Sequence, residues 1–166
     1  MEENKRYDIF LENNKIIAQH NAQPFHSHLM KINQFSDLTP QEFKDKMLMK
    51  SLPNMTEIKR VFKSKKLAGL PKKWDWRLEG AVTPVKEQGS CGSCWTFSTA
   101  GTLEGFQYLK TGHLVPLSEQ NLLDCNLEDE WGCDGGWPAT ALEFVKENGI
   151  VTEETYPYNG KVQTCR

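Results

Sequence analysis

The chain has 166 residues, of which 38% are hydrophobic and 25% are charged, and its formal net charge is −2. This length allows one or two small domains. Because no run of about 18 apolar residues occurs and charged residues directly follow Met1, the sequence predicts neither a transmembrane helix nor a signal peptide, and the near-neutral charge predicts no nucleic-acid partner.

Charge and cysteine are distributed unevenly along the chain. Residues 1–69 contain 12 Lys/Arg and 8 Asp/Glu and carry +4, whereas residues 70–166 contain 8 and 14 and carry −6. All five cysteines lie in the second part, and the Lys-rich stretch 59–66 joins the two. We therefore expect a basic segment followed by an acidic one. An odd cysteine count in a disulfide-bonded protein leaves one thiol unpaired.

The basic segment is predicted to begin with a helix over residues 2–21. At 100° per residue, six positions fall within one arc of about 100°. Glu2 and Arg6 have the spacing of an i,i+4 ion pair, and Pro24 marks the end of the helix. The six positions on this face are Glu2, Arg6, Phe10, Asn13, Ile17 and Asn21.

A short strand over residues 29–35 is expected next. Ser36 or Thr39 then caps a second helix that runs through Glu42 and Phe43. Periodicity alone favours a small helical subdomain for this part of the chain.

The acidic segment contains the residues that predict chemistry. A glycine-punctuated loop over residues 85–95 precedes helical spacing from Thr96 to Leu109, and Gly112 follows as a stop signal. Cys94 is therefore expected at or near a helix N-terminus, where the helix dipole favours the nucleophilic thiolate. Backbone N–H groups of that first turn can bind an oxyanion, and Gln88 can bring a side-chain amide to the same place.

Three arrangements of the cysteines are open on this evidence. A four-thiolate zinc site is one, although the second pair, Cys125 and Cys133, is more widely spaced than in a zinc knuckle. A thioredoxin-like Cys-x-x-Cys dithiol is another. Two disulfides with one reactive thiol account for all five cysteines.

Residues 88–95, with the sequence Gln-Gly-Ser-Cys-Gly-Ser-Cys-Trp, resemble the active-site cysteine signature of papain-family cysteine proteases, the group that includes the lysosomal cathepsins. Residues 117–125, 132–136 and 155–158 are also similar to this family. The predicted helix face resembles the interspersed prosegment motif of cathepsin L-like and H-like members, and Asn33, Phe35 and Asp37 resemble a second prosegment motif.

The resemblance implies an α+β, papain-like fold. Here it would be represented by an inhibitory helical prosegment over residues 1–69 and by the mostly helical left-hand domain over residues 70–166, ending before the β-rich domain. It implies the disulfides Cys91–Cys133 and Cys125–Cys165, and it implies that Glu104 is a buried structural acid rather than a catalyst.

The resemblance also implies the site residues. Cys94 would be the nucleophile, and Gln88 would donate to the oxyanion together with the Cys94 backbone N–H. The residues expected to contact substrate are Gly92, Gly135, Gly136, Trp137 and Pro138. The backbone of the two consecutive glycines would pair with an extended peptide. Trp137 and Pro138 would wall the pocket for the second residue upstream of the scissile bond, unless Trp137 is simply a core aromatic.

The implied activity is endopeptidase hydrolysis through an acyl-thioester, with no cofactor and no metal. The family places its activating His and Asn about 130–150 residues after the nucleophile. This chain extends 72 residues beyond Cys94, and none of its four histidines, His20, His26, His28 and His113, has a motif that marks the base. We therefore expect the chain to be inactive by itself, as one half of a two-domain protease.

Two other functions are alternatives: a prosegment-type inhibitor of cysteine proteases formed by residues 1–69, and a noncatalytic homologue acting as a binding module. The expected partners are peptide or protein substrates, the chain's own prosegment and cystatin-like inhibitors, with no membrane. The resemblance implies a lysosomal or secreted protein, and Asn54 lies in a glycosylation sequon consistent with that route.

Overall fold

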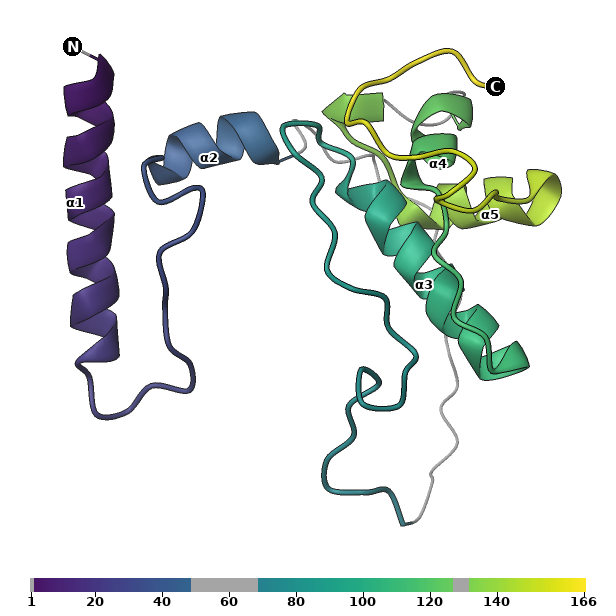
Figure 1. The fold of residues 1–166 in the computed structure, drawn as a ribbon, viewed down its shortest axis with the longest axis horizontal. Helices are drawn as coiled ribbons and strands as arrows, with labels where there is room; N and C mark the ends of the chain where they lie inside the picture. The colour runs from purple at the N-terminus through teal and green to yellow at the C-terminus, as the bar shows by residue number, and fades with distance from the viewer. Residues whose placement is uncertain (1, 49–68, 127–131) are drawn as a thin grey trace. The chain divides into compact units, whose positions relative to one another are not determined.

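The computed structural model describes residues 2–48, 69–126 and 132–166, and it divides the chain into two compact units, residues 1–48 and 49–166 (Figure 1). Asn54 and the Lys-rich stretch 59–66 lie outside the described residues. The domain boundary expected at residue 69 lies next to residues 49–68, which are not described, and it stays a prediction. Within the described ranges, no helix is both long and apolar enough to cross a bilayer.

The first unit consists of α1, Glu2–Asn21, and α2, Pro40–Met47, with an irregular segment between them (Figure 1). Polar residues on the predicted face of α1 bind the returning segment. Arg6 forms ion pairs with Glu2 at 3.3 Å and with Glu42 at 2.5 Å. Asn13 Nδ2 donates to the carbonyls of Ser36 and Leu38 at 2.9 and 3.0 Å. The helix face read from the sequence is therefore the face that holds this unit together.

The strand expected over residues 29–35 is wrong, because these residues form irregular backbone and a turn. The main chain at Met30 pairs with a side chain instead of a strand: Asn21 accepts from the Met30 N–H and donates to the Met30 carbonyl, both at 2.9 Å. Farther along, the Asn33 N–H donates to Ser36 Oγ at 2.9 Å. Side chains that satisfy the backbone in this way replace the partner strand that a ladder would need.

Thr39, and not Ser36, is the N-cap of α2. Its hydroxyl accepts from the Glu42 N–H, and the Glu42 carboxylate accepts from the Thr39 N–H, which completes a capping box with Pro40 at the first helical position. Ser36 instead closes the preceding turn with Asn33.

The second unit contains α3, Cys94–Thr111, α4, Glu119–Cys125, the short 3-10 helix η1, Gly132–Asp134, and α5, Pro138–Asn148. Helix α3 packs against both α4 and α5 (Figure 1). It ends where the sequence predicts, at Gly112, which adopts a left-handed φ of 75° as C-cap. In the described ranges of this unit the β-type pairing is an isolated bridge between Leu117 and Thr152.

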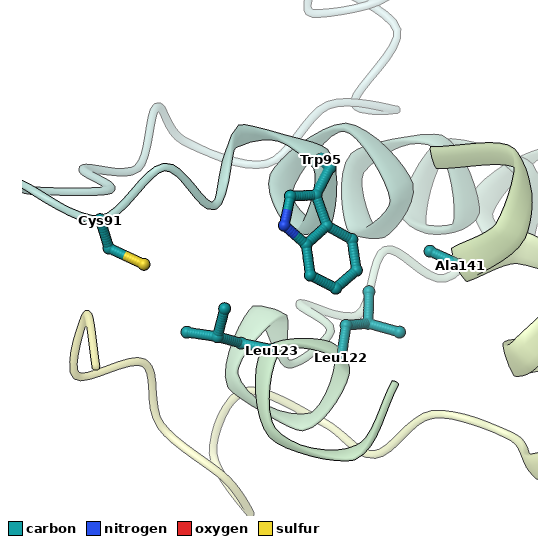
Figure 2. Packing of buried hydrophobic residues seen from close by; sticks show 5 residues of the cluster. All are labelled: Cys91, Trp95, Leu122, Leu123 and Ala141. Carbon is teal, nitrogen blue, oxygen red and sulfur yellow. The ribbon is translucent and has the colours of Figure 1, made fainter. Parts of the chain in front are cut away.

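The apolar core of the second unit gathers around Trp95 in the first turn of α3. Leu122 and Leu123 of α4 and Ala141 of α5 surround the indole, together with the Cys91 side chain (Figure 2). The Trp95 side chain is 1% exposed, and its Nε1 donates to the Gly132 carbonyl at 3.1 Å. Burial of a ring of this size is a major stabilising contribution, and the hydrogen bond satisfies its polar atom. The residue after Cys94 is thereby fixed in the core.

A buried ionic cluster lies at the other side of α3. Glu104 accepts from Thr83 Oγ1 at 2.7 Å, from Lys86 Nζ at 3.0 Å and from the Leu117 N–H at 2.8 Å. Lys86 Nζ also donates to Glu119 at 2.7 Å. Glu104 is thus a hydrogen-bonded structural acid, as expected.

Candidate active site

Cys94 is the first residue of α3, and it is the free cysteine of the chain. The other four are paired: Cys91 with Cys133 at a Cα–Cα distance of 4.6 Å, and Cys125 with Cys165 at 4.8 Å. These bonds occupy the thiols that a zinc site or a Cys91–Cys94 dithiol would need. The thiol at the start of the helix is left as the candidate nucleophile.

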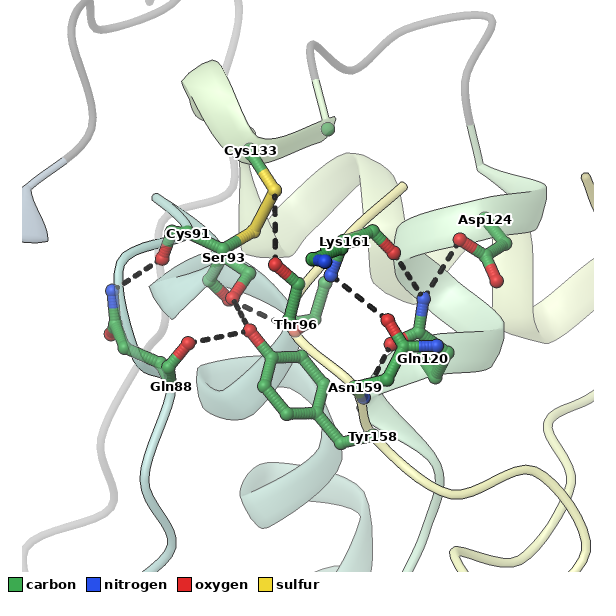
Figure 3. The surroundings of a disulfide bond; sticks show 12 residues. Gln88, Cys91, Ser93, Thr96, Gln120, Asp124, Cys133, Tyr158, Asn159 and Lys161 are labelled. Atoms are coloured by element: carbon green, nitrogen blue, oxygen red, sulfur yellow. Dashed lines mark hydrogen bonds between the residues drawn. A yellow bond between two sulfur atoms is a disulfide. The ribbon is translucent and has the colours of Figure 1, made fainter. Parts of the chain in front are cut away.

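The loop before Cys94 is anchored to residues 132–136. The Gly92 N–H donates to the Cys133 carbonyl at 2.8 Å, next to the disulfide at Cys91. Gln88 belongs to the same loop, and its Nε2 donates to the Cys91 carbonyl at 2.8 Å (Figure 3). The Gln88 side chain is therefore held against the disulfide-linked loop that leads into Cys94. The catalytic roles of Gln88 and Cys94 stay predictions.

A pocket of about 530 Å³ opens beside the thiol. Trp137 is the N-cap of α5 and Pro138 is its first residue, so the start of a second helix forms the wall opposite Cys94. The lining is almost entirely apolar and consists of Cys94, Trp95, Ser98, Trp137, Pro138, Ala139 and Leu142. Trp137 is partly exposed in this wall, and so it is not a fully buried core aromatic.

Gly135 and Gly136 precede this wall and are both buried. Gly135 has a φ of 142°, a conformation that favours glycine. The pairing of these glycines with a substrate backbone remains a prediction.

Within the described part of the second unit, no histidine lies beside Cys94. His113 follows the C-terminal end of α3, and a helix of 18 residues is roughly 27 Å long, so the thiol and this imidazole lie at opposite ends. In the first unit, the His20 ring lies 5.6 Å from that of His26 and 4.6 Å from that of His28, centroid to centroid. No group of three metal-ligating side chains occurs among the residues that the structure describes.

A residue far along the chain, Tyr158, contacts this loop in a way that the sequence did not predict. The Tyr158 hydroxyl donates to the Gln88 carbonyl at 2.8 Å and lies 2.6 Å from Ser93 Oγ (Figure 3). Tyr158 lies in one of the stretches that resemble the family, but nothing in the sequence indicates a contact across 65 residues.

Comparison with known proteins agrees with this geometry. The sequence model of the papain family cysteine proteases matches residues 70–166, and that of the cathepsin propeptide inhibitor domain (I29) matches residues 1–43. The chain belongs to the papain family of cysteine proteases.

Relatives share both parts. Papaya proteinase 4 of Carica papaya is 44% identical over 163 residues, which cover 97% of this chain and 46% of the relative. Human Cathepsin L2 is 44% identical over 171 residues, covering 99% of this chain and 51% of the relative. The chain thus spans about half the length of these relatives. The solved structure of a recombinant stem bromelain precursor has a TM-score of 0.85 at 37% identity, covering 99% of this chain and 53% of that one.

Proposed function

We propose that this chain provides the prosegment and the nucleophile-bearing half of a papain-type cysteine endopeptidase. The observation that carries the proposal is the position of Cys94, a free thiol at the N-terminus of a long helix and in the wall of an apolar pocket. The helix dipole favours the thiolate there. In the first turn the Thr96 N–H donates to the Ser93 carbonyl at 2.9 Å, whereas the Cys94 N–H, as the first amide of the helix, has no intrahelical acceptor. This combination suits attack on a peptide carbonyl.

In the proposed reaction the Cys94 sulfur bonds to the carbonyl carbon, and the carbonyl electron pair moves to the oxygen. The amine then leaves with a proton, and water hydrolyses the resulting thioester to regenerate the thiol. Gln88 and the Cys94 N–H are the proposed donors to the oxyanion. General-base help is needed to move the proton, and His113 is at the wrong end of α3 to provide it. We therefore expect negligible peptide hydrolysis by this chain alone.

The pocket indicates the class of substrate. Its wall is made of Trp137, Pro138 and Leu142, so we propose that it accepts an apolar side chain of a peptide substrate.

Labelling of the chain with two peptidyl chloromethyl ketones tests the proposal. The reagents differ only in the residue before the reactive one, either Phe or Asp. In each, the Cys94 sulfur displaces chloride, and we expect the Phe reagent to react at least about threefold faster. Trp137→Ala should remove most of this preference. Equal rates in the unmodified chain would contradict the proposal.

A second candidate function rests on a separate observation, the match of residues 1–43 to the propeptide inhibitor domain. We propose that this unit inhibits the completed protease intramolecularly, and that it can also inhibit a complete relative. We further propose cystatin-like inhibitors as partners and a lysosomal or secreted location.

A further inference from the structure

We propose that Tyr158 and Ser93 are positioning residues, which hold the Gln88 loop against the N-terminus of α3. They thereby fix the distance between the two proposed oxyanion donors, the Gln88 side-chain amide and the Cys94 N–H. This inference rests on the proposed function, and neither residue belongs to the lining of the pocket beside Cys94.

The hydrogen bonds between Ser93, Tyr158 and Gln88 have a defined direction. The Gln88 carbonyl accepts from the Tyr158 hydroxyl at 2.8 Å, which uses the single proton of the phenol. The contact of 2.6 Å between Ser93 Oγ and the same hydroxyl must then have Ser93 as donor. A directed connection therefore runs from Ser93 through Tyr158 to the Gln88 main chain (Figure 3).

The Ser93 side chain does not cap α3. Ser93 is the N-cap of α3, a position where serine normally accepts from a first-turn N–H, yet it makes no side-chain capping bond. Its hydroxyl, which is completely buried, is directed to Tyr158 instead. The first-turn amides next to Cys94 are thereby left without the usual side-chain acceptor. An N-terminus of this kind is suited to bind an external oxyanion.

Tyr158 is itself held in place by neighbouring residues. Its ring packs edge-on against Phe97 of α3, with centroids 4.9 Å apart. Its N–H donates to Glu153 Oε1 at 2.9 Å, and the next N–H, that of Asn159, donates to the Gln120 side chain of α4 at 3.0 Å. Burial raises the pKa of the Tyr158 hydroxyl above its ordinary value, so it stays a proton donor throughout the neutral range. The phenol is partly buried and is held in place by these contacts with α3, α4 and its own segment.

A peptide aldehyde is a probe of this arrangement in the full chain. The Cys94 sulfur bonds to the aldehyde carbon, the π electron pair moves to the oxygen, and that oxygen takes the proton that the thiol loses. The hemithioacetal oxygen then occupies the oxyanion position. Iodoacetamide, which alkylates the same sulfur with loss of iodide, makes no oxyanion. The ratio of aldehyde affinity to alkylation rate therefore reports the donors and not the thiol alone.

The test compares Tyr158→Phe with Tyr156→Phe as the matched control. Tyr156 lies in the same segment, but its hydroxyl donates to Asp124 at 2.6 Å and lies 3.4 Å from the Thr164 carbonyl instead of bonding to the Gln88 loop. We expect Tyr158→Phe to weaken the peptide aldehyde about tenfold, less than the loss of a donor itself, and to leave the iodoacetamide rate within about twofold. Ser93→Ala should shift the ratio in the same direction. Tyr156→Phe should leave it unchanged, and the melting temperature of each variant shows that it is folded.

A double-mutant cycle completes the test. If Tyr158 acts through Gln88, then Tyr158→Phe has no further effect on aldehyde affinity in a Gln88→Ala background. Additive effects, an unchanged ratio in Tyr158→Phe, or an equal shift in Tyr156→Phe would overturn the inference. Failure of the proposed function is distinguishable: the unmodified chain would then bind the aldehyde no better than free cysteine does, and Gln88→Ala would change nothing.

Discussion

Cys94 differs from the other cysteines in being both unpaired and partly exposed. The disulfides Cys91–Cys133 and Cys125–Cys165 each close a loop of about 40 residues, worth on the order of 3–4 kcal/mol in the chain-entropy model. We predict that iodoacetamide modifies Cys94 alone in the unreduced chain, and that Cys94→Ser abolishes labelling. Peptide mapping by mass spectrometry reads this directly. Label on another cysteine, or stoichiometric zinc, would contradict the assignment.

Lys86 stabilises two buried carboxylates at once. Burial by itself lowers the pKa of Lys86, but hydrogen bonds to Glu119 and Glu104 outweigh it and raise the pKa above the ordinary value. The Glu104 and Glu119 side chains are each 2% exposed. Lys86→Met leaves both carboxylates without their ammonium partner. We expect it to lower the free energy of unfolding by about 3–5 kcal/mol at pH 7, measured by urea unfolding. The exposed Lys146→Met is the control and should change stability by less than about 0.5 kcal/mol.

The pH dependence of the Lys86 variant has a defined sign. Burial raises the pKa of Glu119 above the ordinary value of 4.5. When folding raises the pKa of an acid, the stability linked to that group is complete below its pKa in the unfolded chain. It is lost as pH rises through its pKa in the folded chain. Without Lys86 the pKa of Glu119 rises further. The difference in free energy of unfolding between Lys86→Met and the unmodified chain should therefore shrink as pH is lowered from 7 to 5. A difference that grows on acidification would show that Glu119 is not the group responsible.

Motif reading predicts site residues only where a short stretch of chain contains the whole signal. Gln88, Cys91 and Cys94 fall within eight consecutive residues, so the sequence marks them as candidates, and the catalytic roles of Gln88 and Cys94 stay predictions. Ser93 and Tyr158 were not given a role, because their contact depends on how α4 places the segment after residue 153. Long-range hydrogen bonds of this kind leave no trace in local sequence.

At the scale of elements, prediction succeeded where periodicity was long or a cap was explicit. Helices α1 and α3 have 20 and 18 residues, and both begin or end where the sequence signals indicate. Sequence analysis predicted no element over Glu119–Cys125, because that helix has 7 residues and buries polar side chains. Gln120 and Asp124 bind main-chain groups of residues 159–163 with distances of 2.7–3.0 Å. A composition that suggests exposure is thus compatible with burial where the polar side chains have partners, as those of Gln120 and Asp124 do.

The junction of α1 and α2 is expected to be acid-sensitive. The hydrogen bond from Arg6, followed by the one from the Thr39 backbone, holds the pKa of Glu42 far below its ordinary value of 4.5. A lowered acid pKa gives stability that is present above the unfolded value and is lost as pH falls through the folded one.

We predict that the amide of Phe43 in α2 loses hydrogen-exchange protection between pH 6 and pH 3, after correction for intrinsic rates. Glu42→Gln should be less protected at pH 6 and should show little further loss. Gln41→Ala, on the exposed side of the same helix, is the control. Protection that stays constant in the unmodified chain would mean that the Arg6–Glu42 pair does not hold this junction.

At the scale of the whole molecule, the charge split of +4 for residues 1–69 and −6 for residues 70–166 predicts electrostatic attraction between prosegment and protease. Acidification protonates carboxylates of the acidic part and makes the prosegment more positive, so the attraction should weaken as pH falls. We predict that a peptide of residues 1–69 inhibits a completed protease less well at pH 4.5 than at pH 7, and less well in high salt. Binding that tightens with acid, or that ignores salt, would show that the attraction is not electrostatic.

The most direct test of the central claim is completion of the chain. In a chimera, the carboxyl-terminal part of human Cathepsin L2, beyond the stretch matched here, follows Arg166. The activity measured is hydrolysis of a fluorogenic peptide amide with an apolar residue before the cleaved one, after removal of the prosegment. We predict hydrolysis by the chimera, none by its Cys94→Ser variant, and negligible hydrolysis by the 166-residue chain alone. A folded chimera with a cooperative thermal transition that hydrolyses no peptide, or whose activity survives Cys94→Ser, would contradict the claim that this chain contains the nucleophile half of a cysteine endopeptidase.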